Sequence, residues 1–138
     1  MKISSLVSNS KGRHVVTLRT DDYTHDLTIA PKTMGFGSSV NGGELLFLAL
    51  ATCYCNDIYR EAAQRGIVVQ GVDVEVTGDF GAAGEPAHNI TYRAKVTAQA
   101  GEAEIRELML HTDRVTEIQN TLRVGTPVVL DGIEVVAT

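Results

Sequence analysis

Alternating apolar and polar positions predict four β-strands in two pairs. Residues 14–20 (HVVTLRT) and 24–30 (THDLTIA) flank the polar connection 21–23, a pattern that predicts a β-hairpin. Residues 71–77 place three valines on one face and polar side chains on the other, and residues 90–97 repeat this pattern. Strict alternation is typical of antiparallel strands with one buried and one solvated face.

A long helix is predicted between these two pairs of strands. Residues 43–65 carry no strand-like alternation, and Gly66 follows them as a C-terminal cap. The first half of this segment, which includes ELLFLALATCYC, is apolar on every side, whereas the second half is amphipathic. A helix that is apolar all round must be covered all round. We therefore expect its first half to run through the middle of the molecule or of a dimer.

The C-terminal third predicts a second helical region and a final strand. Residues 101–122 are predicted to be helical with a break near residues 111–112, and residues 127–136 to form a strand or hairpin. No internal repeat or domain boundary interrupts the chain. The predicted fold is α+β: a single domain over residues 1–138, with an antiparallel sheet around a long buried central helix.

Composition narrows the classes of protein that fit. The 138 residues are 43% hydrophobic and 21% charged, as in ordinary globular domains, and the net charge is −5. No basic face is evident, so we expect no nucleic-acid partner. The apolar run 45–51 is far shorter than a membrane span, and the first twelve residues do not resemble a signal peptide. We expect a cytoplasmic protein without membrane contact.

The two cysteines, Cys53 and Cys55, are the main chemical signal. They are too few for a disulfide framework, and the four histidines show no metal-ligand spacing, so no metal or cofactor is expected. Side chains two residues apart on a helix are separated by about 200° around its axis, so the two thiols point to different sides. Each thiol is either a small core residue or a reactive thiolate that needs a nearby cation. The arginines considered for that role are Arg13, Arg19, Arg114 and Arg123.

The order of these parts resembles the OsmC/Ohr family of thiol peroxidases. The resemblance rests on NGGELLFLALATCYC followed by AAQRGI, on GVDVEVTGDF and on LRVGTPVVL. It implies an OsmC-like fold in an intertwined homodimer, and the reduction of organic hydroperoxides by a cysteine on the central helix. The peroxidatic position falls on Cys53, and the assisting arginine and glutamate fall on Arg13 and Glu44. Apolar side chains around Leu46, Phe47 and Leu50 are expected to receive the organic group.

Two departures from the family pattern change the expected chemistry. The family's resolving cysteine falls on Thr116, so this chain has no second thiol at that position. The family's Asn-Pro-Glu helix entry reads Asn41-Gly42-Gly43, which moves the glutamate to the adjacent Glu44. The expected reaction is therefore a one-cysteine cycle completed by an external dithiol.

Two other functions stay open. An OsmC-like dimer without turnover would hold a small apolar ligand, with Cys53 as a core residue. A hot-dog-fold thioesterase would use Glu44 or Asp57 to direct water, but its strands mostly follow the helix, whereas two strands precede it here.

Overall fold

The computed structural model describes all 138 residues, which form two compact units, Met1–Leu46 and Phe47–Thr138. The chain contains five strands and three helices, and both of its sheets are antiparallel. The predicted α+β class is therefore confirmed. The single domain over residues 1–138 stays a prediction.

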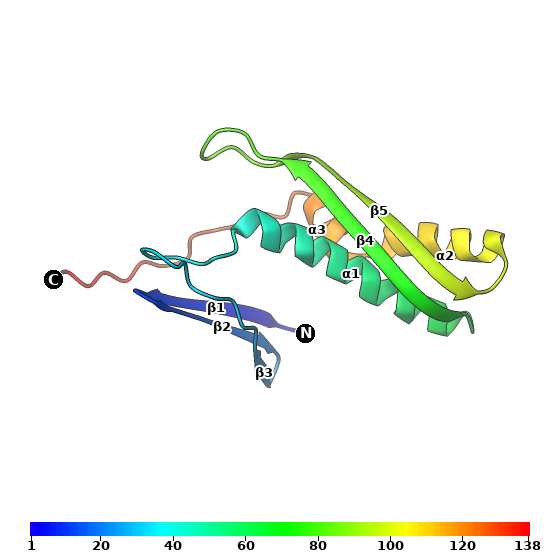
Figure 1. Cartoon of the computed structure of the whole chain (residues 1–138), viewed down its shortest axis with the longest axis horizontal. Coiled ribbons are helices and arrows are strands. Elements are labelled where there is room, and N and C mark those ends of the chain that lie inside the picture. Colours follow the sequence, from blue (N-terminus) through cyan, green and yellow to red (C-terminus); the bar gives the residue numbers. More distant parts are fainter. The chain divides into compact units, whose positions relative to one another are not determined.

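The N-terminal unit contains a three-stranded antiparallel sheet in the order β1-β2-β3 (Figure 1). Strand β2 (Arg13–Thr20) pairs with β3 (Tyr23–Asp26), as predicted, although β3 ends four residues earlier than expected. Strand β1 (Ile3–Ser10) was not predicted, because its serine-rich sequence lacks apolar alternation and all of its residues are exposed. Strand β1 is held in the sheet by backbone pairing along the whole of β2.

Helix α1 (Gly42–Gln64) lies within one residue of its predicted bounds. A reciprocal capping box fixes its start: Asn41 Oδ1 accepts from the Glu44 N–H at 2.8 Å, and Glu44 Oε1 accepts from the Asn41 N–H at 3.0 Å. Gly66, at φ 66°, turns the chain out of the helix as predicted. Neither α1 nor any other helix combines the length and apolarity that a membrane span requires.

The C-terminal unit contains the second predicted strand pair. Strands β4 (Val68–Asp79) and β5 (His88–Gln99) form an antiparallel hairpin and extend a few residues beyond the predicted bounds. Residues alternate between half-buried and exposed along most of both strands, so the predicted buried and solvated faces are confirmed.

The predicted second helical region forms two helices, α2 (Glu102–Val115) and α3 (Glu117–Arg123). The break lies at Thr116, whose backbone is extended, and not near residues 111–112 as expected. The helix continues through Thr112 because the buried hydroxyl of that residue donates to the Leu108 carbonyl at 2.8 Å. That bond satisfies the threonine side chain without interrupting the helix.

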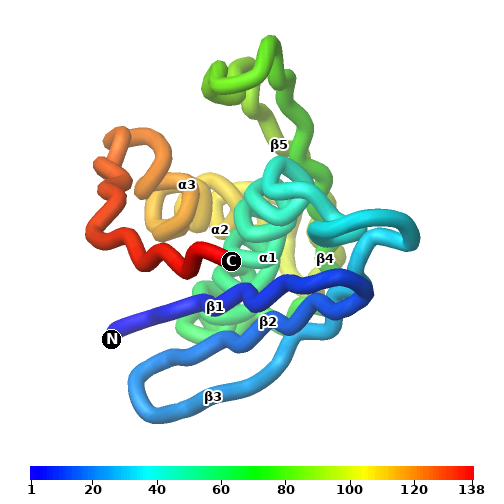
Figure 2. The backbone as a smooth tube through the Cα atoms, turned by 90° about the vertical axis from the view of Figure 1, so that its left-hand side faces the viewer, coloured from blue at the N-terminus to red at the C-terminus, as the bar shows by residue number.

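The second half of α1 supplies most of the core of this unit. Tyr54, Ile58 and Ala62 of α1 form a buried cluster with Leu108 of α2, and apolar residues of β4 and β5 pack against the cluster. Figure 2 shows α1 between the β4–β5 hairpin and the helices α2 and α3. The second half of α1 is thus covered on both sides. The residues of the candidate functional site lie on its face near α3.

Two apolar segments are exposed in one copy of the chain. Leu48, in the first half of α1, is 57% exposed, so one copy does not bury this half on every side, and its burial within a dimer stays a prediction. Residues 127–136 form no strand, contrary to prediction, and Val128 is 98% exposed. A strand needs a backbone partner for its N–H and C=O groups, and this segment finds none in its own chain.

Candidate functional site

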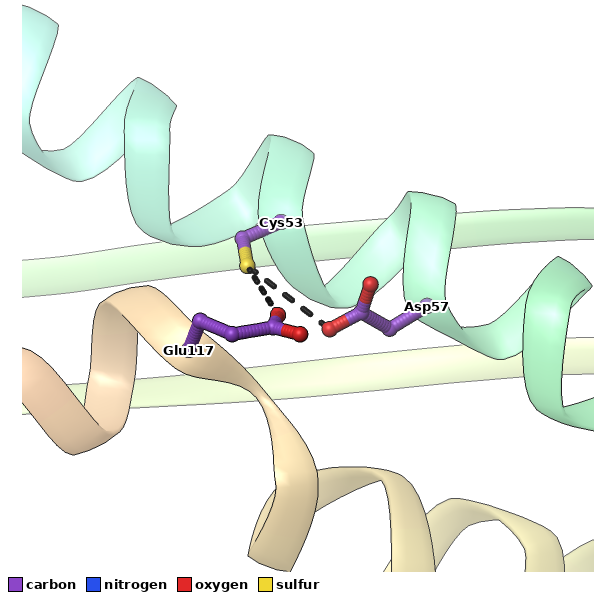
Figure 3. A group of neighbouring side chains, drawn as sticks. All are labelled: Cys53, Asp57 and Glu117. Atoms are coloured by element: carbon purple, nitrogen blue, oxygen red, sulfur yellow. Dashed lines mark hydrogen bonds between the residues drawn. The ribbon is translucent and has the colours of Figure 1, made fainter. Parts of the chain in front are cut away.

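Cys53 lies on α1 beside two carboxyl groups (Figure 3). Its Sγ is 3.7 Å from Asp57 Oδ2 and 3.7 Å from Glu117 Oε2. Asp57 is four residues further along α1 and therefore on the same face of the helix. Glu117 is the first residue of α3. The half-buried thiol can donate its one proton to either carboxyl group.

Thr116 lies next to this group, at the junction of α2 and α3. Its side chain is fully buried, and its Oγ1 donates to Asp57 Oδ2 at 3.1 Å. Cys53 and Thr116 therefore contact the same carboxylate oxygen. The position assigned to the missing resolving cysteine is thus close to Cys53 in space, although 62 residues of sequence lie between them.

Arg60 connects the carboxyl groups. Its Nη1 lies 2.9 Å from Asp57 Oδ1 and 3.3 Å from Glu117 Oε1, and its Nε lies 3.1 Å from Glu61 Oε1. Glu61 is buried and also contacts the His111 ring at 3.1 Å. The Arg60 guanidinium is therefore shared among the carboxylates of Asp57, Glu61 and Glu117.

The surroundings of Cys53 favour the protonated thiol. Burial raises the pKa of Cys53, and the negative charges of Asp57 and Glu117 raise it further, against an opposing hydrogen bond from the Ile118 backbone. Burial also raises the pKa of Asp57. The pKa of Glu117 is instead lowered, first by a hydrogen bond from its own backbone N–H and also by Arg60. The pKa values of the two carboxyl groups are therefore shifted in opposite directions.

The arginines proposed to activate the thiol make other contacts. Arg19 binds the Asp21 carbonyl at 2.7 Å, Arg114 binds Glu107 at 3.3 Å, and Arg123 binds Asp113 at 2.6 Å. Arg13 is exposed at the start of β2. Glu44 is engaged in the capping box of α1. The assisting roles of Arg13 and Glu44 stay predictions.

Asp57 and Arg60 belong to the site by their contacts, but neither was predicted from the sequence to act with the thiol. A local signal existed for Asp57, because positions four apart on a helix share a face. The pattern Asn41-x-x-Glu44 likewise indicates a capping box. Glu117 had no such signal, since it approaches Cys53 only through the packing of α3 on α1.

The three residues of this cluster are also potential metal ligands, although their spacing in the sequence matches no metal-binding motif. One ligand atom each from Cys53, Asp57 and Glu117 lies within 4.8 Å of the others. A thiolate with two carboxylates is a chemically possible zinc ligand set. Arg60, however, already places a cation against both carboxylates. Nothing further in the cluster indicates a metal.

Replacing Glu117 with glutamine is expected to increase the rate of Cys53 alkylation by iodoacetamide at pH 7 several-fold. Removing a negative charge beside the sulfur lowers the thiol pKa, so the thiolate fraction rises at a fixed pH below that pKa. The pH profile of alkylation should therefore move to lower pH. The measurement uses a Cys55→Ser background, so that only Cys53 reacts.

Glu107→Gln is the matched control, because it removes an exposed carboxylate of α2 that pairs with Arg114. The pH profile of Cys53 alkylation in Glu107→Gln should match that of the parent. Equal profiles for Glu117→Gln and Glu107→Gln would contradict an electrostatic effect of Glu117 on the thiol.

Comparison with solved structures identifies the fold. An OsmC-like protein from Mycoplasma pneumoniae matches with a TM-score of 0.60 and 21% sequence identity, over 91% of this chain and 87% of that one. An organic hydroperoxide resistance protein OsmC from Legionella pneumophila, also described as a predicted redox protein, matches with a TM-score of 0.56 and 20% identity. That match covers 87% of this chain and 89% of the other. The predicted OsmC-like fold is therefore confirmed.

A putative organic hydroperoxide resistance protein from Vibrio cholerae matches with a TM-score of 0.51 and 24% identity, over 88% of this chain and 85% of that chain. None of the curated proteins compared with the chain matches it. The sequence itself matches the family described as OsmC-like protein over residues 35–131. Since this match covers more than half of the chain, the protein belongs to the OsmC-like family.

Proposed function

We propose that this protein reduces organic hydroperoxides through Cys53, in a cycle that uses one cysteine of the chain. The observation that carries the proposal is the position of the thiol between Asp57 and Glu117, two carboxyl groups whose pKa values are shifted in opposite directions. A carboxylate within reach of a thiol can take its proton and return that proton to a leaving group. The family and the descriptions of its structural neighbours support the choice of substrate.

In the first step the thiol proton passes to the ionised Glu117 carboxylate. The sulfur electron pair attacks the terminal oxygen of the hydroperoxide, an S–O bond forms and the O–O bond breaks. The departing alkoxide takes that proton from Glu117 and leaves as an alcohol, while Asp57 stays paired with Arg60. Cys53 is thereby oxidised to the sulfenic acid, the hydroperoxide is reduced, and Glu117 is ionised again.

The sulfenic acid is then reduced from outside the chain. Thr116 supplies a hydroxyl where a resolving thiol would stand. Cys55 lies about 200° around the helix from Cys53. A first external thiol therefore condenses with the sulfenic acid, releasing water and forming a mixed disulfide. A second thiol cleaves that disulfide and restores Cys53, which an external dithiol can accomplish alone.

We further propose that the working form is a homodimer. The support is the exposure, in one copy, of large apolar side chains: Leu48 on α1, and Val128, Leu130 and Ile133 in the C-terminal segment. Burying such side chains against a second copy would remove their apolar surface from water. Light scattering coupled to size-exclusion chromatography tests this proposal: a monomer mass at micromolar concentration would contradict it.

A second function, ligand binding by an OsmC-like protein without turnover, is favoured by the raised pKa of Cys53. Few thiolates exist at neutral pH when burial and two carboxylates disfavour them. In this case Cys53 is a packing residue. The two functions differ in whether peroxide oxidises the sulfur.

Trapping of sulfenic acid with a dimedone-type probe tests the peroxidase proposal. Wild type, Cys53→Ser and Cys55→Ser are treated with cumene hydroperoxide or hydrogen peroxide, and labelling is located by mass spectrometry. We expect labelling on Cys53 that is faster with the organic peroxide, absent in Cys53→Ser and retained in Cys55→Ser. If no variant is labelled, the peroxidase proposal is wrong and the ligand-binding function is favoured.

A further inference from the structure

Glu61 of α1 is a buried acidic residue that the proposed reaction does not use. Both of its carboxylate oxygens are engaged. Oε1 accepts a hydrogen bond from Arg60 Nε at 3.1 Å, and Oε2 lies 3.3 Å from Arg65 Nη1 and 3.1 Å from His111 Nε2. Burial alone would raise the pKa of Glu61, but hydrogen bonds from Arg60 and Arg65 lower it overall. Glu61 is therefore a fixed negative charge in the interior.

Arg60 presents two different nitrogen atoms to its carboxylate partners. Nε is bound by Glu61, whereas Nη1 lies 2.9 Å from Asp57 Oδ1 and 3.3 Å from Glu117 Oε1. Asp57 and Glu61 are four residues apart, so they lie on the same face of α1. Because a guanidinium is planar and rigid, a contact at Nε restricts where Nη1 can lie. The contact with Glu61 therefore helps to place positive charge between Asp57 and Glu117.

The contacts of Arg60 differ in how firmly they can hold its side chain. That side chain is 43% exposed, and the Glu117 side chain is 64% exposed, so water and salt weaken the pair that they form. The Asp57 and Glu61 side chains are only 7% and 8% exposed, so their contacts with Arg60 are screened less. Without Glu61, Asp57 would be the one buried carboxylate holding Arg60. A single such contact leaves the guanidinium free to turn away from Glu117.

We propose that Glu61 is a positioning residue: its buried carboxylate holds the Arg60 guanidinium between Asp57 and Glu117, and this placement keeps Glu117 ionised. An ionised Glu117 accepts the Cys53 proton in the proposed reaction, so the consequence for reactivity rests on the proposed function. The placement of Arg60 does not depend on that function and is tested without peroxide.

The test follows the titration of the Glu117 carboxyl group by carbon-13 NMR in reduced protein with EDTA, and Glu117→Gln assigns the signal. In Glu61→Gln we expect Glu117 to titrate at higher pH than in wild type. The pKa of Glu117 is lowered by its own backbone N–H and also by Arg60, so losing the placement of Arg60 raises it. The loss of the Glu61 charge acting through space would instead lower it. A purely structural role would change the urea midpoint and leave this titration in place.

The matched control is Glu102→Gln, which removes an exposed partner of Arg106 at the start of α2 and should leave Glu117 unchanged. Adding Glu61→Gln to an Arg60→Met chain should give no upward shift, because no guanidinium remains to be placed. Glu61→Asp keeps the charge but withdraws it from Arg60 by one carbon. It should give the same upward shift, and it repeats the test if Glu61→Gln does not fold. An unchanged or lower titration of Glu117 in a folded Glu61 variant, or an equal upward shift without Arg60, would overturn the proposal.

Discussion

Peroxide treatment of a Thr116→Cys variant is expected to end in an intrachain disulfide between positions 53 and 116, where the wild type ends in a sulfenic acid. Thr116 Oγ1 and Cys53 Sγ contact the same oxygen of Asp57, at 3.1 and 3.7 Å. A thiol at position 116 therefore lies close to the sulfur that peroxide would oxidise in the proposed reaction. It attacks the sulfenic sulfur, an S–S bond forms and water leaves. The dimedone label should be lost almost completely.

The measurement is non-reducing peptide mapping in a Cys55→Ser background. Thr121→Cys is the control, because Thr121 is an exposed threonine of α3, the helix that follows Thr116. It should retain the dimedone label on Cys53 and form no internal disulfide. A Thr116→Cys chain that keeps full labelling after peroxide, while folded, would show that positions 53 and 116 do not approach each other as described.

Replacing Ile58 with alanine is expected to lower the free energy of unfolding by about 2–5 kcal/mol. Ile58 is fully buried at the centre of the cluster that joins α1 to α2 and to the β4–β5 hairpin. Removing its outer carbons loses apolar burial and leaves a cavity that the surrounding helices and strands fill only in part. Urea unfolding monitored by circular dichroism gives the difference.

Two further variants bracket this effect. Ile58→Val should cost about 0.5–1.5 kcal/mol, since less volume is removed. Val124→Ala, at a position that is 77% exposed, should change the free energy of unfolding by no more than about 0.5 kcal/mol. Similar costs for Ile58→Ala and Val124→Ala would contradict the assigned core.

The regular elements of the C-terminal unit were predictable because their sequence periodicity reflects burial. Valines in β4 alternate with charged residues, and Gly66 ends α1 at the residue where a left-handed backbone is needed. Strand β1 was not predictable in this way. Its residues are exposed on both faces, so only backbone pairing with β2 specifies it.

The site was predictable in part. The family resemblance assigned Cys53 and Thr116 to the site, and the structure places both against Asp57. The network around Arg60 was not predicted, because it depends on the tertiary packing that brings α3 against α1. The break between α2 and α3 was displaced for a similar reason: Thr112 bonds back to Leu108 within the helix, whereas Thr116 bonds across to Asp57.

The carboxylates around Cys53 have a consequence for which oxidants can reach it. Arg60 is shared by Asp57 and Glu117, the two carboxyl groups nearest the sulfur, and also contacts Glu61, with which Arg65 pairs as well. The chain as a whole carries a net charge of −5. When Asp57 and Glu117 are both ionised, the charge beside the sulfur is negative, and it would oppose the approach of an anion but not of an uncharged hydroperoxide. In the proposed reaction, the acidic surroundings would therefore favour neutral oxidants over anionic ones.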